Sequence, residues 1–281
     1  MTIDNLFYDE SFYPIFILGK KTYPVVVTYC SAINEIRTIV DSQILTDNEK
    51  RLKLSEIRKI FINPESSNEN HLISKLGKQF VAEKLSSSLF LEILNFYETD
   101  ISASNIKIPE EYVSHCRQSA APVGRFIMAI ANEDLSTYYS AEILAVLLKN
   151  VAMLNNIKND LSLRNRCYIP ESYLQKNNIR QTDLSLSYTM PQVSEILKDY
   201  VASVSQLQAD AEALFKVVKN FKIRRRLGVI LSLTNFMIKK YKKNDFLQKK
   251  QYITGYDRVK AECLGLIKAF YCRNNKKRLV V

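Results

Sequence analysis

Glycine and proline are scarce in this chain, which has six glycines and seven prolines among its 281 residues. An average protein of this length would contain roughly 20 glycines. Sandwiches, barrels and glycine-rich nucleotide-binding folds need many tight turns, so the shortage of turn residues disfavours all three. No two glycines are spaced as a P-loop or a dinucleotide-binding fingerprint requires. The composition instead favours long helices joined by polar loops.

Side chains that bind transition metals are also few. The chain has two histidines and five cysteines, and no two cysteines form a CxxC pair, so a zinc site is not expected. Most of the cysteines lie in apolar, helix-like sequence and are expected to be buried thiols. Buried free thiols fit a reducing compartment, and we therefore expect a cytoplasmic protein.

Long uncharged apolar runs are missing as well. The longest apolar stretch, 141–154, is interrupted by Glu142, Lys149 and Asn150, so no membrane-spanning helix is expected. The N-terminal sequence is acidic and aromatic, and it lacks the basic start and the cleavage site of a signal peptide.

Positive charge, by contrast, is abundant, with a net charge of +11. Such a charge favours anionic partners, which are phosphates, nucleic acid or an anionic membrane surface, although a lysine-rich solvated surface explains it equally well. The segments 239–243 and 274–278 are strongly basic. They are consistent with peripheral contact with a membrane or with solvated helix ends, and we expect no nucleic-acid partner.

Apolar residues recur with helical spacing along most of the chain. We find neither an internal repeat nor a linker, so the sequence predicts one all-α domain over residues 1–281, with a lead-in over 1–20 and a basic tail from about residue 273. The predicted helices cover residues 24–39, 47–61, 71–97, 110–130, 136–160, 191–219, 224–242 and 256–272.

Segment 115–126 places Pro122 and Gly124 inside an apolar helical run. In a helix interior proline costs about 3 kcal/mol and glycine about 1 kcal/mol. Their presence indicates close helix packing or the wall of a cavity. Arg117 and Arg125 flank the proline at positions that can share one helix face. Together these features suggest a pocket for a long apolar ligand with an anionic head.

A second polar set lies near the end of the predicted helix 136–160. Met153, Asn156 and Asp160 follow i, i+3, i+7 spacing and therefore share one face. The side-chain oxygen atoms of Asn156 and Asp160 point either into a cavity in the core or into solvent at the last turn of the helix, and the spacing alone leaves both alternatives open.

The order of these segments resembles the squalene/phytoene synthase family, and in particular its bacterial hydroxysqualene-synthase branch. Segment 116–125, Cys-Arg-Gln-Ser-Ala-Ala-Pro-Val-Gly-Arg, is very similar to the motif CRxSAxPVGR of that branch. Residues 156–160 resemble its NxxxD motif, residues 166–170 resemble GRxYLP, and residues 4–30 resemble its opening.

The resemblance implies an all-α isoprenoid-synthase fold with a central cavity, in which two prenyl diphosphates such as farnesyl diphosphate are condensed head to head. In this family two aspartate-rich motifs on facing helices hold Mg²⁺, which neutralises the departing diphosphate. The hydroxysqualene branch implies no need for NADPH.

The acidic motifs are incomplete in this sequence. In the first, Glu35 alone carries a carboxylate and Arg37 adds a positive charge; in the second, Asp160 is kept and Arg164 replaces its partner. Glu35 and Asp160 are therefore the expected magnesium ligands and catalytic residues. A cation about 4 Å from Mg²⁺ opposes its binding by roughly 8 kcal/mol at an effective dielectric constant near 20. The two arginines could instead bind a diphosphate directly.

The ligand implied by the resemblance is a prenyl diphosphate or another anionic amphiphile. Two hypotheses follow: a diverged prenyltransferase, or a catalytically impaired binding or assembly factor, as in the respiratory complex I assembly factor that the family includes. The expected substrate-binding residues are Arg117, Arg125, Arg166, Asn156, Ser119, Ala120, Val123 and Gly124.

Overall fold

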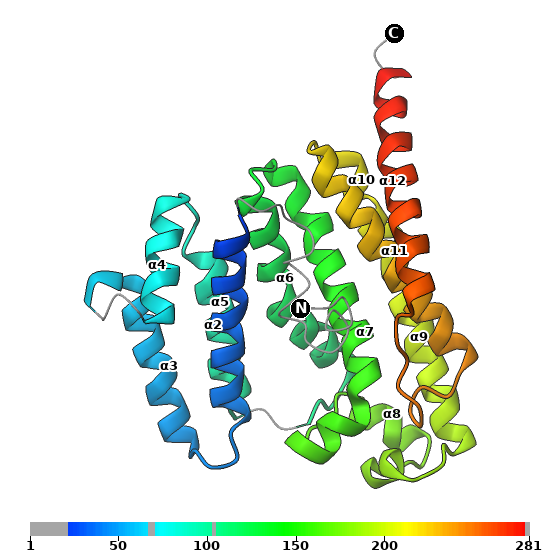
Figure 1. The fold of residues 1–281 in the computed structure, drawn as a ribbon. Helices are drawn as coiled ribbons and strands as arrows, with labels where there is room; N and C mark the ends of the chain where they lie inside the picture. Colours follow the sequence, from blue (N-terminus) through cyan, green and yellow to red (C-terminus); the bar gives the residue numbers. More distant parts are fainter. Residues whose placement is uncertain (1–21, 67–70, 103–104, 279–281) are drawn as a thin grey trace.

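The computed structural model describes residues 22–66, 71–102 and 105–278. Their secondary structure is entirely helical, so the all-α prediction is confirmed for this part of the chain (Figure 1). The lead-in predicted for residues 1–20 lies outside the described residues. No helix in the described part is long and apolar enough to cross a bilayer.

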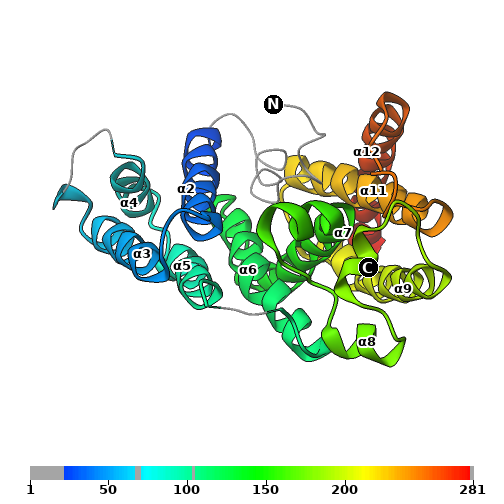
Figure 2. The same ribbon diagram turned by 90° about the horizontal axis from the view of Figure 1, so that it is seen from below.

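The first four long helices lie together on one side of the molecule (Figures 1 and 2). Pro24 occupies the first turn of one of them, where its missing N–H costs nothing. Thr46 and Glu49 form a reciprocal capping box that fixes the start of the next. These helices are α2 (Tyr23–Asp41), α3 (Asp47–Ile62), α4 (Leu72–Ala82) and α5 (Ser88–Asp100), with the short turn η3 (Pro64–Ser66) after α3.

Two long helices, α6 (Pro109–Ile130) and α7 (Tyr138–Arg164), run through the middle of the molecule (Figure 2). Gly124 lets them approach closely, because a Cβ atom at this position would lie 2.7 Å from the carbonyl carbon of Ala141. Pro122 is accommodated within α6. Asp134 caps the short η4 turn (Leu135–Thr137) that leads into α7.

The remaining helices cover the opposite side of α7 (Figure 2). The longest of them, α11 (Phe221–Lys243) and α12 (Gly255–Arg278), pack closely along each other. The others are α8 (Glu171–Lys176), η5 (Gln181–Ser185), α9 (Pro191–Glu212) and α10 (Leu214–Val217).

An aromatic stack joins the first group of helices to the central pair. The ring of Tyr29 on α2 lies parallel to that of Phe126 on α6, with centroids 3.7 Å apart. The Tyr29 hydroxyl donates a hydrogen bond to the Leu89 carbonyl of α5 at 3.0 Å. Buried apolar residues from α2 to α12 form one connected core cluster, which holds the helices that build the site described below.

Two predicted boundaries are corrected by the structure. The single helix predicted over 71–97 is interrupted, and α4 and α5 are separated by residues 83–87. Lys84 adopts a left-handed conformation there (φ 54°), and the Leu85 N–H bonds back to the Phe80 carbonyl to close α4. Residues 161–190, between two of the predicted helices, contain the end of α7, the short α8 and η5.

Candidate functional site

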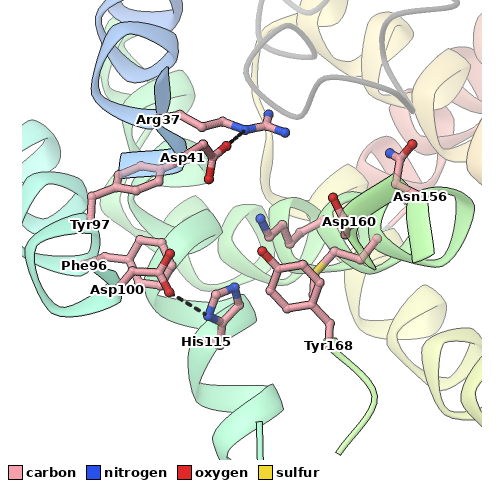
Figure 3. Close-up of a pocket in the computed structure, with 11 residues that line it drawn as sticks. Arg37, Asp41, Phe96, Tyr97, Asp100, His115, Asn156, Asp160 and Tyr168 are labelled. Carbon is pink, nitrogen blue, oxygen red and sulfur yellow. Dashed lines mark ion pairs between the residues drawn. The ribbon is translucent and has the colours of Figure 1, made fainter. Parts of the chain in front are cut away.

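A small polar pocket of about 30 Å³ lies where α2, α5, α6 and α7 meet (Figure 3). We call it the polar pocket. Its wall combines three aspartates and two cations with aromatic rings, so it offers both charge and a weakly polar lining. The lining residues are Arg37 and Asp41 of α2, Phe96, Tyr97 and Asp100 of α5, His115 of α6, Lys149, Met153, Asn156 and Asp160 of α7, and Tyr168.

Helical spacing explains why α7 contributes four of these residues. Lys149, Met153, Asn156 and Asp160 recur every three or four residues and so follow one face of the helix. Met153, Asn156 and Asp160 thus line one cavity, which decides between the two alternatives that their spacing left open. Asp160 is 6% exposed.

Two of the three aspartates are held by arginines. The Asp41 carboxylate lies 3.5 Å from the Arg37 guanidinium one helical turn away. Asp100 is 8% exposed at its side chain and forms an ion pair with Arg166, which also donates to the Asp100 backbone carbonyl at 2.6 Å. Arg166, predicted as a substrate contact, is therefore held in an ion pair with Asp100. Its guanidinium joins the loop after α7 to the end of α5.

His115 is a strongly perturbed titratable group of the pocket. Burial, together with the nearby positive charges of Lys149 and Arg166, lowers its pKa to about 3. Its Nδ1 lies 3.8 Å from an Asp100 oxygen, too far for a hydrogen bond, and the imidazole is neutral at neutral pH. Its ring lies 5.0 Å from Phe96 and 5.1 Å from Tyr168.

Glu35 lies outside the polar pocket, although the sequence predicts it as a ligand facing Asp160. Glu35 is half-buried on α2 but is not among the residues that line the pocket, whereas Arg37 and Asp41 of the same helix are. At about 100° per residue, Glu35 points roughly 200° away from Arg37. The carboxylate that α2 contributes is therefore that of Asp41. Asp41 follows Arg37 by four residues, and this spacing could have indicated from the sequence that the two share a helix face.

Asn156 lies in the polar pocket, and its amide oxygen accepts a hydrogen bond from the Lys250 ammonium at 3.2 Å. Its amide nitrogen donates to the Ala152 carbonyl one turn back on α7. Lys250, in the segment between α11 and α12, was not anticipated from the sequence because it is distant from every motif. It adds a positive charge behind Asn156.

Arg117 and Arg125 share one face of α6, as their spacing predicts, but they line a different cleft from the polar pocket. Arg125 forms ion pairs with Glu92 of α5 and with Glu142 of α7, the second at 3.1 Å. Arg117 is 66% exposed and lies 3.7 Å from Glu142. The two guanidiniums face carboxylates that join α5, α6 and α7, rather than the aspartates of the polar pocket.

The small residues of α6 lie in helix packing, and none of them lines the polar pocket. Ala120, Val123 and Gly124 are buried. Ser119 is half-buried, and its hydroxyl donates to the His115 carbonyl at 2.8 Å. The sequence left two explanations open for segment 115–126, close helix packing or the wall of a cavity. At Gly124 the structure shows close helix packing.

The residues that the structure describes do not fit a magnesium cluster. No group of three or more His, Cys, Asp or Glu side chains in the described part of the chain is arranged to hold a metal ion. Of the three aspartates in the pocket, Asp41 and Asp100 are each paired with an arginine. Arg164, the other cation predicted near the second acidic motif, has a side chain outside the described set. We therefore derive no catalytic step through magnesium.

A larger cavity of about 510 Å³ lies on the other side of the α6–α7 interface. The Cys116 thiol, which lines this cavity, contacts the Met153 sulfur, which lines the polar pocket, at 3.7 Å. The cavity wall is mainly apolar and comes from α6, α7, α8 and α9. Its residues include Tyr112, Val113, Val146, Tyr173, Ile196, Tyr200, Val204 and Leu207.

In the described part of this all-helical chain, the central helices enclose a charged pocket with aromatic walls. Comparison with known proteins gives the family. The sequence model described as squalene/phytoene synthase matches residues 8–257, and the chain belongs to this family.

Individual relatives are distant but similar along most of their length. A hydroxysqualene synthase of Sinorhizobium fredii is 22% identical over 249 residues, which cover 87% of this chain and 84% of that protein. A hydroxysqualene synthase of Zymomonas mobilis is 20% identical over 262 residues, covering 92% and 86%. The crystal structure of a squalene synthase from Alicyclobacillus acidocaldarius matches with a TM-score of 0.70 at 15% identity, covering 81% and 85%. This last likeness shows the fold.

Proposed function

We propose that the protein is a diverged prenyltransferase of isoprenoid biosynthesis that condenses prenyl diphosphates, of which farnesyl diphosphate is the first to test, head to head. The observation that carries the proposal is the polar pocket, where α2 and α7 bring Arg37, Lys149, Asn156 and Asp160 together within a chain of this family. In this protein, catalysis would depend on the cationic side chains of Arg37 and Lys149, which would bind the diphosphate as it leaves.

The chemistry required of the pocket is stabilisation of separating charges. The pocket of about 30 Å³ holds only a water or two as it stands, so its side chains would move apart as the diphosphate binds. Arg37 and Lys149 would then neutralise the growing negative charge, an interaction that strengthens in the transition state. The faces of Phe96, Tyr97 and Tyr168 in the same wall would stabilise the allylic cation left behind. Asp41 and Asp160 would orient the two cations.

The assay is incubation of the purified full chain with farnesyl diphosphate, with and without Mg²⁺, while pyrophosphate release and C30 products are followed. We expect Asp41→Asn and Asp160→Asn to lower turnover about 100-fold, because each carboxylate would orient a cation that receives the diphosphate, and a misplaced catalytic group costs about this much. Glu35→Gln is the matched control on α2 and should leave turnover within about twofold, because Glu35 does not line the pocket. Equal effects of Asp41→Asn and Glu35→Gln would contradict this assignment.

A second function, ligand binding without turnover, is favoured by one observation. Arg37 lies in the polar pocket and pairs with Asp41, so a carboxylate that could serve a metal ion is already neutralised. A binding or assembly factor built this way would hold a prenyl diphosphate tightly, independently of Mg²⁺, and release no pyrophosphate. Titration calorimetry with farnesyl diphosphate and the Arg37→Gln variant, alongside the turnover assay, separates the two functions.

In the native host, the double variant Asp41→Ala with Asp160→Ala distinguishes them again. Loss of the cellular phenotype in a folded double variant would support the transferase, and its retention would support the binding or assembly factor.

A further inference from the structure

Helix α12 exposes an almost continuous apolar stripe to solvent. Between residues 256 and 271 the exposed positions follow helical spacing, and Lys260 is the only charged side chain among them. Five of the apolar side chains are between 49% and 74% exposed. We call this set the α12 stripe. It comprises Tyr256, Val259, Cys263, Leu266, Ile267, Phe270 and Tyr271.

The opposite face of α12 carries the small residues. Ala261 and Ala269 are fully buried, and Gly265 meets Gly228 of α11 so closely that a Cβ atom on Gly228 would lie 2.7 Å from the Gly265 Cα atom. A surface helix normally turns its bulky apolar residues inward and its polar residues outward. On α12 the bulky residues face outward, which indicates that this face is buried against something outside the fold.

Charge at the end of the helix indicates what that partner is. After Glu262 the sequence contains no acidic residue, and α12 continues to Arg278 through a strongly basic segment. Figure 1 shows this end of α12 projecting beyond the neighbouring helices. The basic residues after Glu262 are Lys268, Arg273, Lys276, Lys277 and Arg278.

We propose that the α12 stripe docks the protein on an anionic lipid bilayer, with the helix lying in the plane of the interface. An apolar helical stripe beside a cluster of basic residues is the combination that binds such surfaces, because apolar burial and attraction to anionic headgroups act together. Tyr256 and Tyr271 are of the residue type that gathers at the boundary between headgroups and hydrocarbon. This proposal does not depend on the catalytic function proposed above.

A second copy of the chain is the competing occupant, and the size of the stripe argues against it. A segment of 16 residues is about 24 Å long, and one helix face about 10 Å wide therefore offers on the order of 250 Å². A stable dimer buries about 800 Å² on each partner. A bilayer needs no such complementary area.

The chain contains no tryptophan, so a single introduced tryptophan reports on its own surroundings. Full-length Ile267→Trp is mixed with vesicles of phosphatidylglycerol and phosphatidylcholine, and separately with vesicles of phosphatidylcholine alone. We expect a blue shift of the emission with the anionic vesicles and a smaller shift with the neutral ones. Leu52→Trp is the matched control, because Leu52 is 62% exposed on α3, on the opposite side of the molecule from α12 (Figures 1 and 2), and its emission should not change.

Co-sedimentation with the same vesicles tests the stripe by removing it. Val259→Ser with Ile267→Ser should lower the partition coefficient on anionic vesicles at least about tenfold, because both side chains would leave the bilayer's apolar boundary. Leu52→Ser with Ile62→Ser, at exposed apolar positions of α3, should bind like the unchanged protein. Circular dichroism and thermal unfolding verify that both variants are folded.

Three results would overturn the proposal. The first is a folded stripe variant that binds anionic vesicles as tightly as the unchanged protein. The second is binding that does not distinguish anionic from neutral vesicles. The third is a concentration-dependent dimer in analytical ultracentrifugation that the stripe variant abolishes, with no vesicle binding by the unchanged chain, because that result assigns the stripe to a second copy.

Discussion

At the scale of single residues, the polar pocket shows how burial changes the chemistry of a side chain. His115 is enclosed between two aromatic rings and faces Asp100, Lys149, Arg166 and Tyr168. Because its pKa falls to about 3 in the folded protein, from about 6.5 in the unfolded chain, the unfolded chain binds more protons between these values. The stability that this residue contributes is therefore present above about pH 6.5 and is lost as the pH falls.

We predict that His115→Phe weakens the dependence of stability on pH. Between neutral pH and about pH 4.5 the buried histidine should lower the free energy of unfolding of the unchanged protein by roughly 2.5 kcal/mol, and a phenylalanine ring removes this loss. Urea unfolding at several pH values between about 7 and 4.5 measures the slope. His71→Asn is the control, since His71 caps α4 through its side chain and asparagine preserves a cap. Parallel slopes for His115→Phe and the unchanged protein would contradict the assignment.

Arg166 supports a second prediction at this scale. Removing its charge leaves the buried Asp100 carboxylate without its ion-pair partner, so we expect Arg166→Met to lower the free energy of unfolding by about 2–4 kcal/mol. Arg180→Met is the matched control, because Arg180 is 84% exposed in its own pair with Asp183, and it should cost less than about 1 kcal/mol. In chemical denaturation, equal losses in the two variants would show that Arg166 contributes only as a surface charge.

At the scale of elements, α6 and α7 approach each other closely at Gly124. Because Gly124 faces the backbone of Ala141 and Glu142, an added methyl group can be accepted only if the helices separate. We predict that Gly124→Ala destabilises the protein by about 1–3 kcal/mol. Gly255→Ala is the control at the start of α12, where a Cβ atom meets nothing within 4 Å, and should be neutral or slightly stabilising. Denaturation midpoints of the two variants compare these positions directly.

The elements also show what sequence periodicity can and cannot predict. The α2, α3, α6 and α11 helices begin and end within a few residues of their predicted positions, because proline, capping residues and apolar spacing act locally. The break between α4 and α5 was missed because Lys84 gives no local signal for a left-handed conformation. Asp41 was missed for another reason. The face of α2 that meets α5 and α7 depends on tertiary packing, and a motif centred on Glu35 gives no information about that packing.

At the scale of the whole molecule, the polar pocket could not be assembled from sequence alone. Asp100 and Arg166 are 66 positions apart, and neither residue type is informative until α5 and the loop after α7 are placed together. Family resemblance supplied the fold and identified Asn156 and Asp160, which follow the NxxxD spacing on one helix. It named Arg37 and Arg166 but not their pairing with Asp41 and Asp100, because pairing is a property of three-dimensional position.

The single core makes a final prediction about the whole chain. Buried apolar residues from α2 through α12 belong to one cluster, so we expect one cooperative unfolding transition, with a calorimetric enthalpy of about 200 kcal/mol near 60 °C that equals the van't Hoff enthalpy. Ile93→Ala on α5 and Leu231→Ala on α11, both fully buried, should each lower the same midpoint for every probe. Two transitions, with each variant shifting only one of them, would instead divide the chain into two domains, because a cavity destabilises only the unit that unfolds with it.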